Sequence, residues 1–143
     1  DILSTVVVLT AFIPMLMDTG GNSGNQSSTL IIRGLATGDV ELEDIWKVLW
    51  KEFRISLLVG ITLASVNFAK NMLFDRVGLA VSLTVSITVA STVVIAKMVG
   101  GILPLIAKRL KLDPAIMAGP LITTLVDALA LMVYFGIASV FLM

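Results

Sequence analysis

Four long apolar stretches constrain the fold of this 143-residue chain more than any other feature of its sequence. A helix needs about 20 mostly apolar residues to cross roughly 30 Å of hydrocarbon, and such stretches cover about residues 1–36, 55–74, 77–106 and 115–142. Hydrophobic residues make up 57% of the chain and charged residues only 14%, which is too little polar surface for a soluble domain of this size. The sequence therefore predicts an all-α fold, a polytopic transmembrane helical bundle.

Two segments of the sequence depart from the pattern of a simple apolar span. Polar residues from Gly20 onward interrupt the first stretch, and we expect its helix to bend or break near residues 20–25. Residues of about 40–54 place Trp46 and Trp50 on an apolar helical face and Lys47 and Glu52 on a charged one. This pattern predicts an amphipathic helix lying in the membrane interface. A linker helix packed on protein is the alternative.

Composition excludes several function classes. The chain has no cysteine, so it has no disulfide, no thiolate nucleophile and no iron–sulfur site. It has no histidine, which removes the usual catalytic triad and imidazole metal ligands. Its formal net charge is zero, whereas a nucleic-acid-binding protein needs a basic field. We therefore expect neither an enzyme nor a nucleic-acid partner, and we expect membrane lipid to surround the chain.

The distribution of basic residues predicts the orientation. The loops at Arg33–Arg54 and Lys108–Lys111 lie on one side and carry seven Lys and Arg residues, against two (Lys70 and Arg76) on the other. The positive-inside rule places the richer loops in the cytoplasm of a multi-pass protein of the cell membrane, with both ends of the chain outside. Because a start on the outside at Asp1 is unusual, at least one earlier membrane helix is expected to be missing.

Asp127 is the most informative residue, because it lies near the middle of the last apolar stretch. A charge at that depth costs about 2.5–3.5 kcal/mol on insertion scales and marks a functional site by default. Thr123 and Thr124 lie one helical turn away on the same face. An ion or proton site is one interpretation, and a structural ion pair with Lys97 is the other.

A second polar feature lies at residues 20–29. If this segment is helical, its amides and hydroxyls form one stripe that should face a bundle interior or a water-filled path. Helix–helix hydrogen bonding is the alternative. All these candidate ligands offer oxygen, which hard cations prefer, and one carboxylate suits an ion that keeps much of its water, as Mg²⁺ does. Two copies on a two-fold axis fit a divalent ion, and one copy fits a monovalent ion or a proton.

Two ordered motifs stand out in the sequence. One runs from Pro14 through GGNSGNQSST at 20–29 to RGLA at 33–36, with Gly38. The other comprises LDPA at 112–115, GPLITT at 119–124, and Asp127 with Ala128. With these motifs the sequence resembles the MgtE-type magnesium channels and transporters over essentially the whole chain. The resemblance implies a homodimer with five membrane helices per subunit and a pore on the two-fold axis. This chain then corresponds to helices two to five, without the first helix and without the family's cytosolic Mg²⁺-sensing domains.

The resemblance also implies which residues hold a hydrated Mg²⁺. Asp127 matches the family's aspartate of the last helix, and the pore-lining candidates are Asn22, Asn25, Thr29, Gly119, Thr123 and Thr124. The predicted function is a channel or transporter that conducts hydrated Mg²⁺. The alternatives are an exchanger coupled to Na⁺ or H⁺ and a non-transporting membrane assembly subunit. Asp18 lies near the predicted outer mouth and is interpreted as a solvated loop acid, with electrostatic attraction of cations as the alternative.

Overall fold

The structure, a computed structural model, describes residues 2–142. Within that range the chain is helical throughout, with five α-helices: α1 (Ile2–Ala11), α2 (Ile13–Thr37), α3 (Ile45–Lys70), α4 (Leu79–Arg109) and α5 (Pro120–Leu142). Three short helices connect them: η1 (Leu42–Asp44), η2 (Asn71–Asp75) and η3 (Pro114–Met117). Four segments of the described chain are long and apolar enough to cross a membrane: Ser4–Thr37, Leu42–Asp75, Leu79–Arg109 and Pro114–Leu142. The predicted all-α fold with four spans is confirmed at this level.

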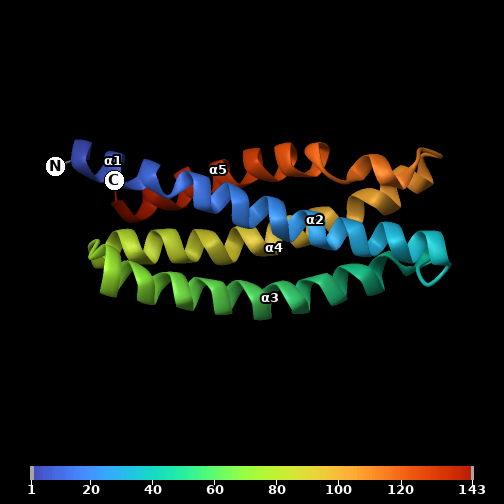
Figure 1. The fold of residues 1–143 in the computed structure, drawn as a ribbon, viewed down its shortest axis with the longest axis horizontal. Coiled ribbons are helices and arrows are strands. Elements are labelled where there is room, and N and C mark those ends of the chain that lie inside the picture. Colours follow the sequence, from blue (N-terminus) through green and yellow to red (C-terminus); the bar gives the residue numbers. More distant parts are fainter. Residues whose placement is uncertain (1, 143) are drawn as a thin grey trace.

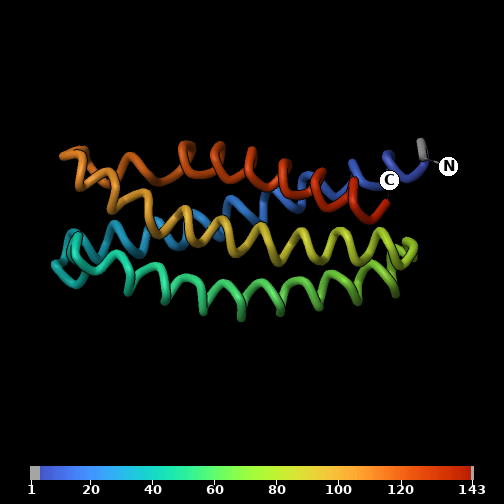
Figure 2. The backbone as a smooth tube through the Cα atoms, turned by 180° about the vertical axis from the view of Figure 1, so that it is seen from behind, coloured from blue at the N-terminus to red at the C-terminus, as the bar shows by residue number. Residues whose placement is uncertain are grey.

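Helix α4 is the centre of the bundle. It packs against α2, α3 and α5, with α3 along one edge of the molecule and α5 along the other (Figures 1 and 2). The first and last described residues lie at the same end, beside the turn that joins α3 to α4 (Figure 1). The loop between α2 and α3 and the connection from α4 to α5 lie at the opposite end. This arrangement agrees with a chain whose two ends are on one side of a membrane.

The interior face of α4 is made of small residues, many of them hydroxylated. Its buried hydroxyls include those of Thr84 and Thr88. These hydroxyls donate to the carbonyl oxygens of Ala80 and Thr84, one helical turn earlier, at 2.8 and 2.7 Å. These two donors are satisfied within their own helix, whereas the buried hydroxyls of Ser82, Ser86 and Thr92 on α4 have no hydrogen-bond partner among the described residues. Small side chains in turn let the neighbouring helices approach α4 closely.

The expected break near residues 20–25 is not found there. Helix α2 is continuous from Ile13 to Thr37, and the break lies at Phe12, between α1 and α2. Pro14 explains the position, because proline has no N–H to donate and is tolerated only in the first turn of a helix. Gly20 and Gly21 stay helical because both are buried in helix contacts, where they leave room for neighbouring side chains.

The expected amphipathic helix and the second span form one helix. Helix α3 runs without interruption from Ile45 to Lys70, since no proline or turn residue separates the two segments. Trp46 and Trp50 are 79% and 59% exposed, and the ring contacts of Trp50 are with Phe53 and Arg54 of its own helix. Glu52, which the amphipathic pattern placed on the charged outer face, is instead buried.

The last span is divided in two by a glycine. The carboxylate of Asp113 accepts a hydrogen bond from the N–H of Ala115 at 3.0 Å, which caps a helix start as expected. That start belongs to the short helix η3, and α5 begins only at Pro120. Gly119 between them has a φ of 62°, in the left-handed region that favours glycine. The turn at Gly119 sets the direction in which α5 enters the bundle.

Candidate functional site

A polar pocket lies between α2 and α5, at the position of the acid predicted from the sequence. Its volume is about 180 Å³. It is lined by Met17, Asp18, Gly21, Asn22, Thr123 and Asp127. Two carboxylates, one amide and one hydroxyl therefore border a single space. Oxygen donors of this kind suit a hard cation such as Mg²⁺, Ca²⁺ or Na⁺.

The close approach of α2 and α5 forms this pocket. A Cβ atom on Gly21 would lie 3.2 Å from the methyl group of Thr123, and one on Gly20 would lie 2.9 Å from Val126. Glycine at these positions lets the α2 backbone come within contact distance of α5. The glycines that were predicted to break the helix therefore act as contact residues. They bring Asn22 and Asp127 to the same pocket.

The two threonines of α5 have their hydroxyl hydrogens engaged. The hydroxyl of Thr124 donates to the Pro120 carbonyl at 2.8 Å, and that of Thr123 lies 3.1 Å from the same oxygen and 3.2 Å from the Gly119 carbonyl. A hydroxyl that donates in this way keeps its lone pairs for accepting. Thr123 can therefore present an acceptor oxygen to the pocket. Thr124 is exposed and does not line it.

Asn25 and Gly119 meet each other outside the pocket. The side-chain oxygen of Asn25 accepts the N–H of Gly119 at 2.9 Å. Nearby, the hydroxyl of Ser28 donates to the Met117 carbonyl at 2.5 Å. Helix starts leave backbone N–H groups without partners, and Asn25 satisfies one of them. These bonds tie α2 to the turn before α5, so the structure assigns Asn25 and Gly119 a role in holding the site together.

The exposed polar stripe on α2 agrees in most positions with the stripe predicted from the sequence. Asn22, Gln26, Thr29 and Arg33 are all exposed, one to two helical turns apart. Thr29 lies two turns beyond Asn22, outside the pocket but on the same side of the helix. The described chain therefore presents amides and hydroxyls on an open face at membrane depth.

Asp18 lies in a different structural setting from the one predicted from the sequence. It is not in a loop: it lies in α2, one turn before Asn22, and lines the same pocket as Asp127. The prediction of a break after Asp18 hid this relation. An unbroken helix over residues 13–37 places Asp18, Asn22 and Thr29 on one face by their spacing alone.

Lys97 does not pair with Asp127 in the described structure. Its ammonium group donates to the side-chain oxygen of Gln26 at 2.9 Å and lies 3.3 Å from the Ser27 hydroxyl oxygen. Ion pairs among the described residues join Lys47 to Asp44 and Lys70 to Asp75. The alternative interpretation of Asp127, a structural ion pair with Lys97, is therefore not what the structure shows. Lys97 contacts Gln26 and Ser27 instead.

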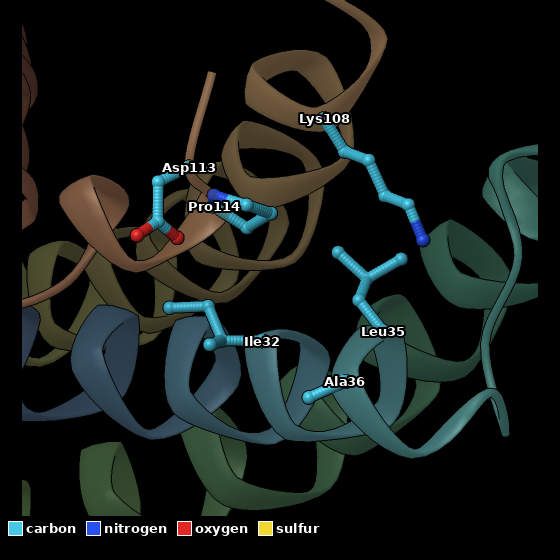
Figure 3. Close-up of a pocket in the computed structure, with 6 residues that line it drawn as sticks. All are labelled: Ile32, Leu35, Ala36, Lys108, Asp113 and Pro114. Carbon is cyan, nitrogen blue, oxygen red and sulfur yellow. The ribbon is translucent and has the colours of Figure 1, made fainter. Parts of the chain in front are cut away.

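A second pocket lies at the opposite end of α2 and is mostly apolar. It has a volume of about 240 Å³ and is lined by Ile32, Leu35, Ala36, Lys108, Asp113 and Pro114. Figure 3 shows that the Lys108 and Asp113 side chains extend in different directions. One carboxylate oxygen of Asp113 is already engaged by Ala115. This pocket has no converging polar groups and is a poorer candidate site than the one at Asp127.

Comparison with known proteins identifies a family. The sequence profile of MgtE, described as a divalent cation transporter, matches residues 13–137. The chain is 40% identical to the magnesium transporter MgtE of Thermus thermophilus and 39% identical to that of Bacillus subtilis, in both cases over 99% of this chain. The magnesium transporter MgtE of Enterococcus faecalis is 28% identical. The chain spans about 31% of the length of these relatives.

Proposed function

This chain belongs to the MgtE family of divalent cation transporters, and from that premise we propose that two copies of it conduct hydrated Mg²⁺ across the membrane. Family membership confirms the predicted resemblance and a family role in transport rather than in enzymatic catalysis. The proposal adds the ion, the pathway and the residues that line it.

The observation that carries the proposal is the open polar face around the Asp127 pocket. Asp18, Asn22 and Thr29 are exposed and Asp127 is only partly covered. A carboxylate facing hydrocarbon is costly, and amides there lack partners. A second copy related by a two-fold axis would bring the same face opposite itself, so that water and ions fill the space between two α2 and two α5 helices.

The chemistry of the pocket favours an ion that keeps much of its water shell. Its two carboxylates, one amide and one hydroxyl cannot replace a full shell of six oxygens, and Mg²⁺ gives up its waters reluctantly. The Asp127 carboxylates of two copies neutralise one divalent ion. Asn22 and Thr123 offer oxygens that accept hydrogen bonds from the ion's waters. Contacts through water attract the ion without trapping it, as conduction requires.

The other site residues predicted from the sequence have different roles. Asn25 and Gly119 hold the start of α5 against α2 and so keep Asp127 in place. Thr29 and Thr124, both exposed, extend the hydrophilic lining beyond the pocket. Mg²⁺ is thus the transported ion, and it binds transiently at Asp127.

The proposed membrane orientation follows the basic residues. Arg33–Arg54 and Lys108–Lys111 lie at the end of the bundle opposite the described chain ends, which agrees with both groups facing the cytoplasm. Both ends of the chain then face the outside of the cell or inner membrane. We further propose that the additional length of the relatives contains cytosolic Mg²⁺-sensing domains, which favour a closed state when they bind the ion.

Transport is tested by Mg²⁺ uptake into proteoliposomes, reported by an enclosed indicator, with a Mg²⁺ gradient and no Na⁺ or H⁺ gradient. We expect uptake that follows the Mg²⁺ gradient alone. Uptake only when a Na⁺ or H⁺ gradient is imposed would replace the channel by a coupled exchanger. Absence of uptake under every gradient would support the non-transporting assembly subunit.

The dimer is tested by cross-linking. Because the chain has no cysteine, a single Cys reports only contacts between copies. We expect Ala128→Cys, next to Asp127 on the exposed side of α5, to be joined into a dimer by a short bifunctional maleimide. Leu58→Cys, 72% exposed on α3, is the matched control and should remain monomeric on a gel. Cross-linking of Leu58→Cys without cross-linking of Ala128→Cys would place the interface away from this side of α5.

Asp18→Asn is expected to raise the Mg²⁺ concentration at half-maximal uptake by about three- to tenfold at low ionic strength. The second carboxylate of the pocket attracts cations through a field that salt screens, so the difference should shrink as ionic strength rises. Uptake titrations at two salt concentrations measure both effects. Glu43→Gln removes the same charge from an exposed residue of η1, just before α3. We expect it to change neither the half-saturating Mg²⁺ concentration nor its dependence on salt. Equal effects of the two variants would exclude a local role for Asp18.

A further inference from the structure

A group of buried polar side chains joins α2, α3 and α4 behind the polar face. The ammonium group of Lys97 donates to the Gln26 side-chain oxygen at 2.9 Å and contacts the Ser27 hydroxyl oxygen at 3.3 Å. The Ser27 hydroxyl donates to a carboxylate oxygen of Glu52 at 2.5 Å. We call these four residues the buried network. The cation pathway proposed above does not use Lys97 or Glu52.

The network is balanced in charge and deeply buried. In the described part of the chain, Glu52 and Lys97 are the charged side chains with less than one-tenth exposure, each at 2%. Ser27, fully buried, lies between them and bonds both. An unpaired charge in this position would be strongly destabilising, whereas opposite charges joined by hydrogen bonds compensate each other. Lys97 and Glu52 are therefore linked through the Ser27 hydroxyl, and the Glu52 carboxylate is engaged inside the bundle rather than at the ion pathway.

The surrounding backbone is shaped to admit these side chains. A Cβ atom on Gly101 would lie 3.0 Å from the Cγ atom of Glu52, so glycine leaves the space in which the glutamate enters. One on Gly100 would lie 2.2 Å from the carbonyl oxygen of Gly24, in the turn of α2 that precedes Gln26 and Ser27. Helix α2 is therefore in direct backbone contact with α4 next to the network, and the network fixes how α2 is rotated against it.

Gln26 connects the network to the polar face. It is exposed on the same stripe of α2 as Asn22 and Thr29, yet its side-chain oxygen is held by the buried Lys97. We infer that Lys97 and Glu52 are positioning residues: through Gln26 and Ser27 they hold α2 at the rotation that turns Asn22 and Thr29 to the ion pathway. This inference rests on the proposed function, because the pathway is the one proposed there.

A charge-balanced double variant separates positioning from a purely structural role. Lys97→Met with Glu52→Gln removes both charges together, so that neither variant residue leaves behind the uncompensated buried charge that makes a single removal strongly destabilising. The chain should therefore fold, but Lys97 no longer holds Gln26. Gln26→Leu removes the same contact by a change at an exposed position of α2, and Lys97 keeps its contact with the Ser27 hydroxyl. Lys47→Met, at an exposed lysine, is the matched control.

The readout is the reactivity of single cysteines on α2 toward a charged, water-soluble thiosulfonate. With the wild-type network, Asn22→Cys is exposed and should react, whereas Ser23→Cys is 8% exposed and should not. In the double variant and in Gln26→Leu we expect the ratio of the two rates to fall about tenfold or more, because rotation of α2 costs less once the bonds to Lys97 are gone. The half-saturating Mg²⁺ concentration should rise in parallel.

Unchanged reactivity at both cysteines, in both network variants, would overturn the inference and leave the network a purely structural set of hydrogen bonds. A change of the same size in Lys47→Met would also overturn it, since Lys47 pairs with Asp44 and takes no part in the buried network. The labelling needs no ion movement. If the wild-type protein transports no Mg²⁺, the proposed function fails, while the cysteine rates still decide whether the network positions α2.

Discussion

Asp127→Asn is expected to reduce Mg²⁺ uptake at sub-saturating concentration by about 30-fold or more. Two unit charges 4 Å apart interact by about 1 kcal/mol in bulk water and about 4 kcal/mol at an effective dielectric constant of 20, so removing two carboxylates from beside a hydrated divalent ion costs about 2 kcal/mol or more, and each 1.4 kcal/mol is a factor of ten. In a dimer the substitution removes two charges from the pocket between α2 and α5. Asparagine has nearly the same volume as aspartate and keeps an acceptor oxygen. The loss is therefore expected in uptake rather than in folding.

The measurement is initial uptake into proteoliposomes containing equal amounts of folded protein, judged by gel filtration and thermal unfolding in detergent. Glu43→Gln again provides a matched charge change away from the pocket. Uptake by Asp127→Asn within about twofold of wild type would remove Asp127 from the pathway. An unfolded Asp127→Asn variant would contradict the account as well, because no structural partner of the carboxylate is proposed.

Gly100→Ala is expected to lower the free energy of unfolding by about 3 kcal/mol, at the upper end of the range for overpacked sites. The added Cβ atom would lie 2.2 Å from the Gly24 carbonyl oxygen, far inside van der Waals contact, and both partners are backbone atoms that cannot rotate away. Helices α2 and α4 must separate, which also disturbs the buried network and the pocket. We expect lower thermal stability together with reduced Mg²⁺ uptake.

Gly136→Ala is the matched control for this prediction. Nothing lies within 4 Å of the Cβ atom it would add, and alanine is the better helix former. Thermal unfolding in the same detergent should show no loss of stability for Gly136→Ala. If Gly100→Ala unfolded at the same temperature as Gly136→Ala, the close contact between α2 and α4 at Gly100 would be contradicted.

The membrane spans could be predicted from the sequence because they depend on local composition. A run of about 20 apolar residues identifies a helix that can cross a membrane without reference to the rest of the chain. The rare acid within such a run, Asp127, could be identified for the same reason. The break in the first span could not. Glycine favours a break when a helix is considered alone, but Gly20 and Gly24 are packed against α4 and α5, and packing outweighs the local preference.

The site could be predicted only in part, because its assembly depends on contacts between distant residues. Asn22, Thr123 and Asp127 do line one pocket. Asn25 has the residue type of a ligand, but its oxygen holds the N–H of Gly119, a partner 94 residues away that no spacing rule identifies. Glu52 belongs to an amphipathic pattern that indicates an outer face, whereas its partners Ser27 and Lys97 lie on other helices. Asp18 was missed because the predicted break removed it from its helical face.

The central claim is that a hydrated divalent cation occupies the pocket between α2 and α5 beside Asp127. Anomalous diffraction from crystals of the protein soaked in Mn²⁺, a divalent ion that also prefers oxygen ligands, tests it most directly. We predict an anomalous peak in the pocket lined by Asp18, Asn22 and Asp127, separated from the carboxylate by a layer of water, and its disappearance in Asp127→Asn crystals. A pocket without a peak in wild-type crystals, or a peak that persists in the variant, would contradict the account.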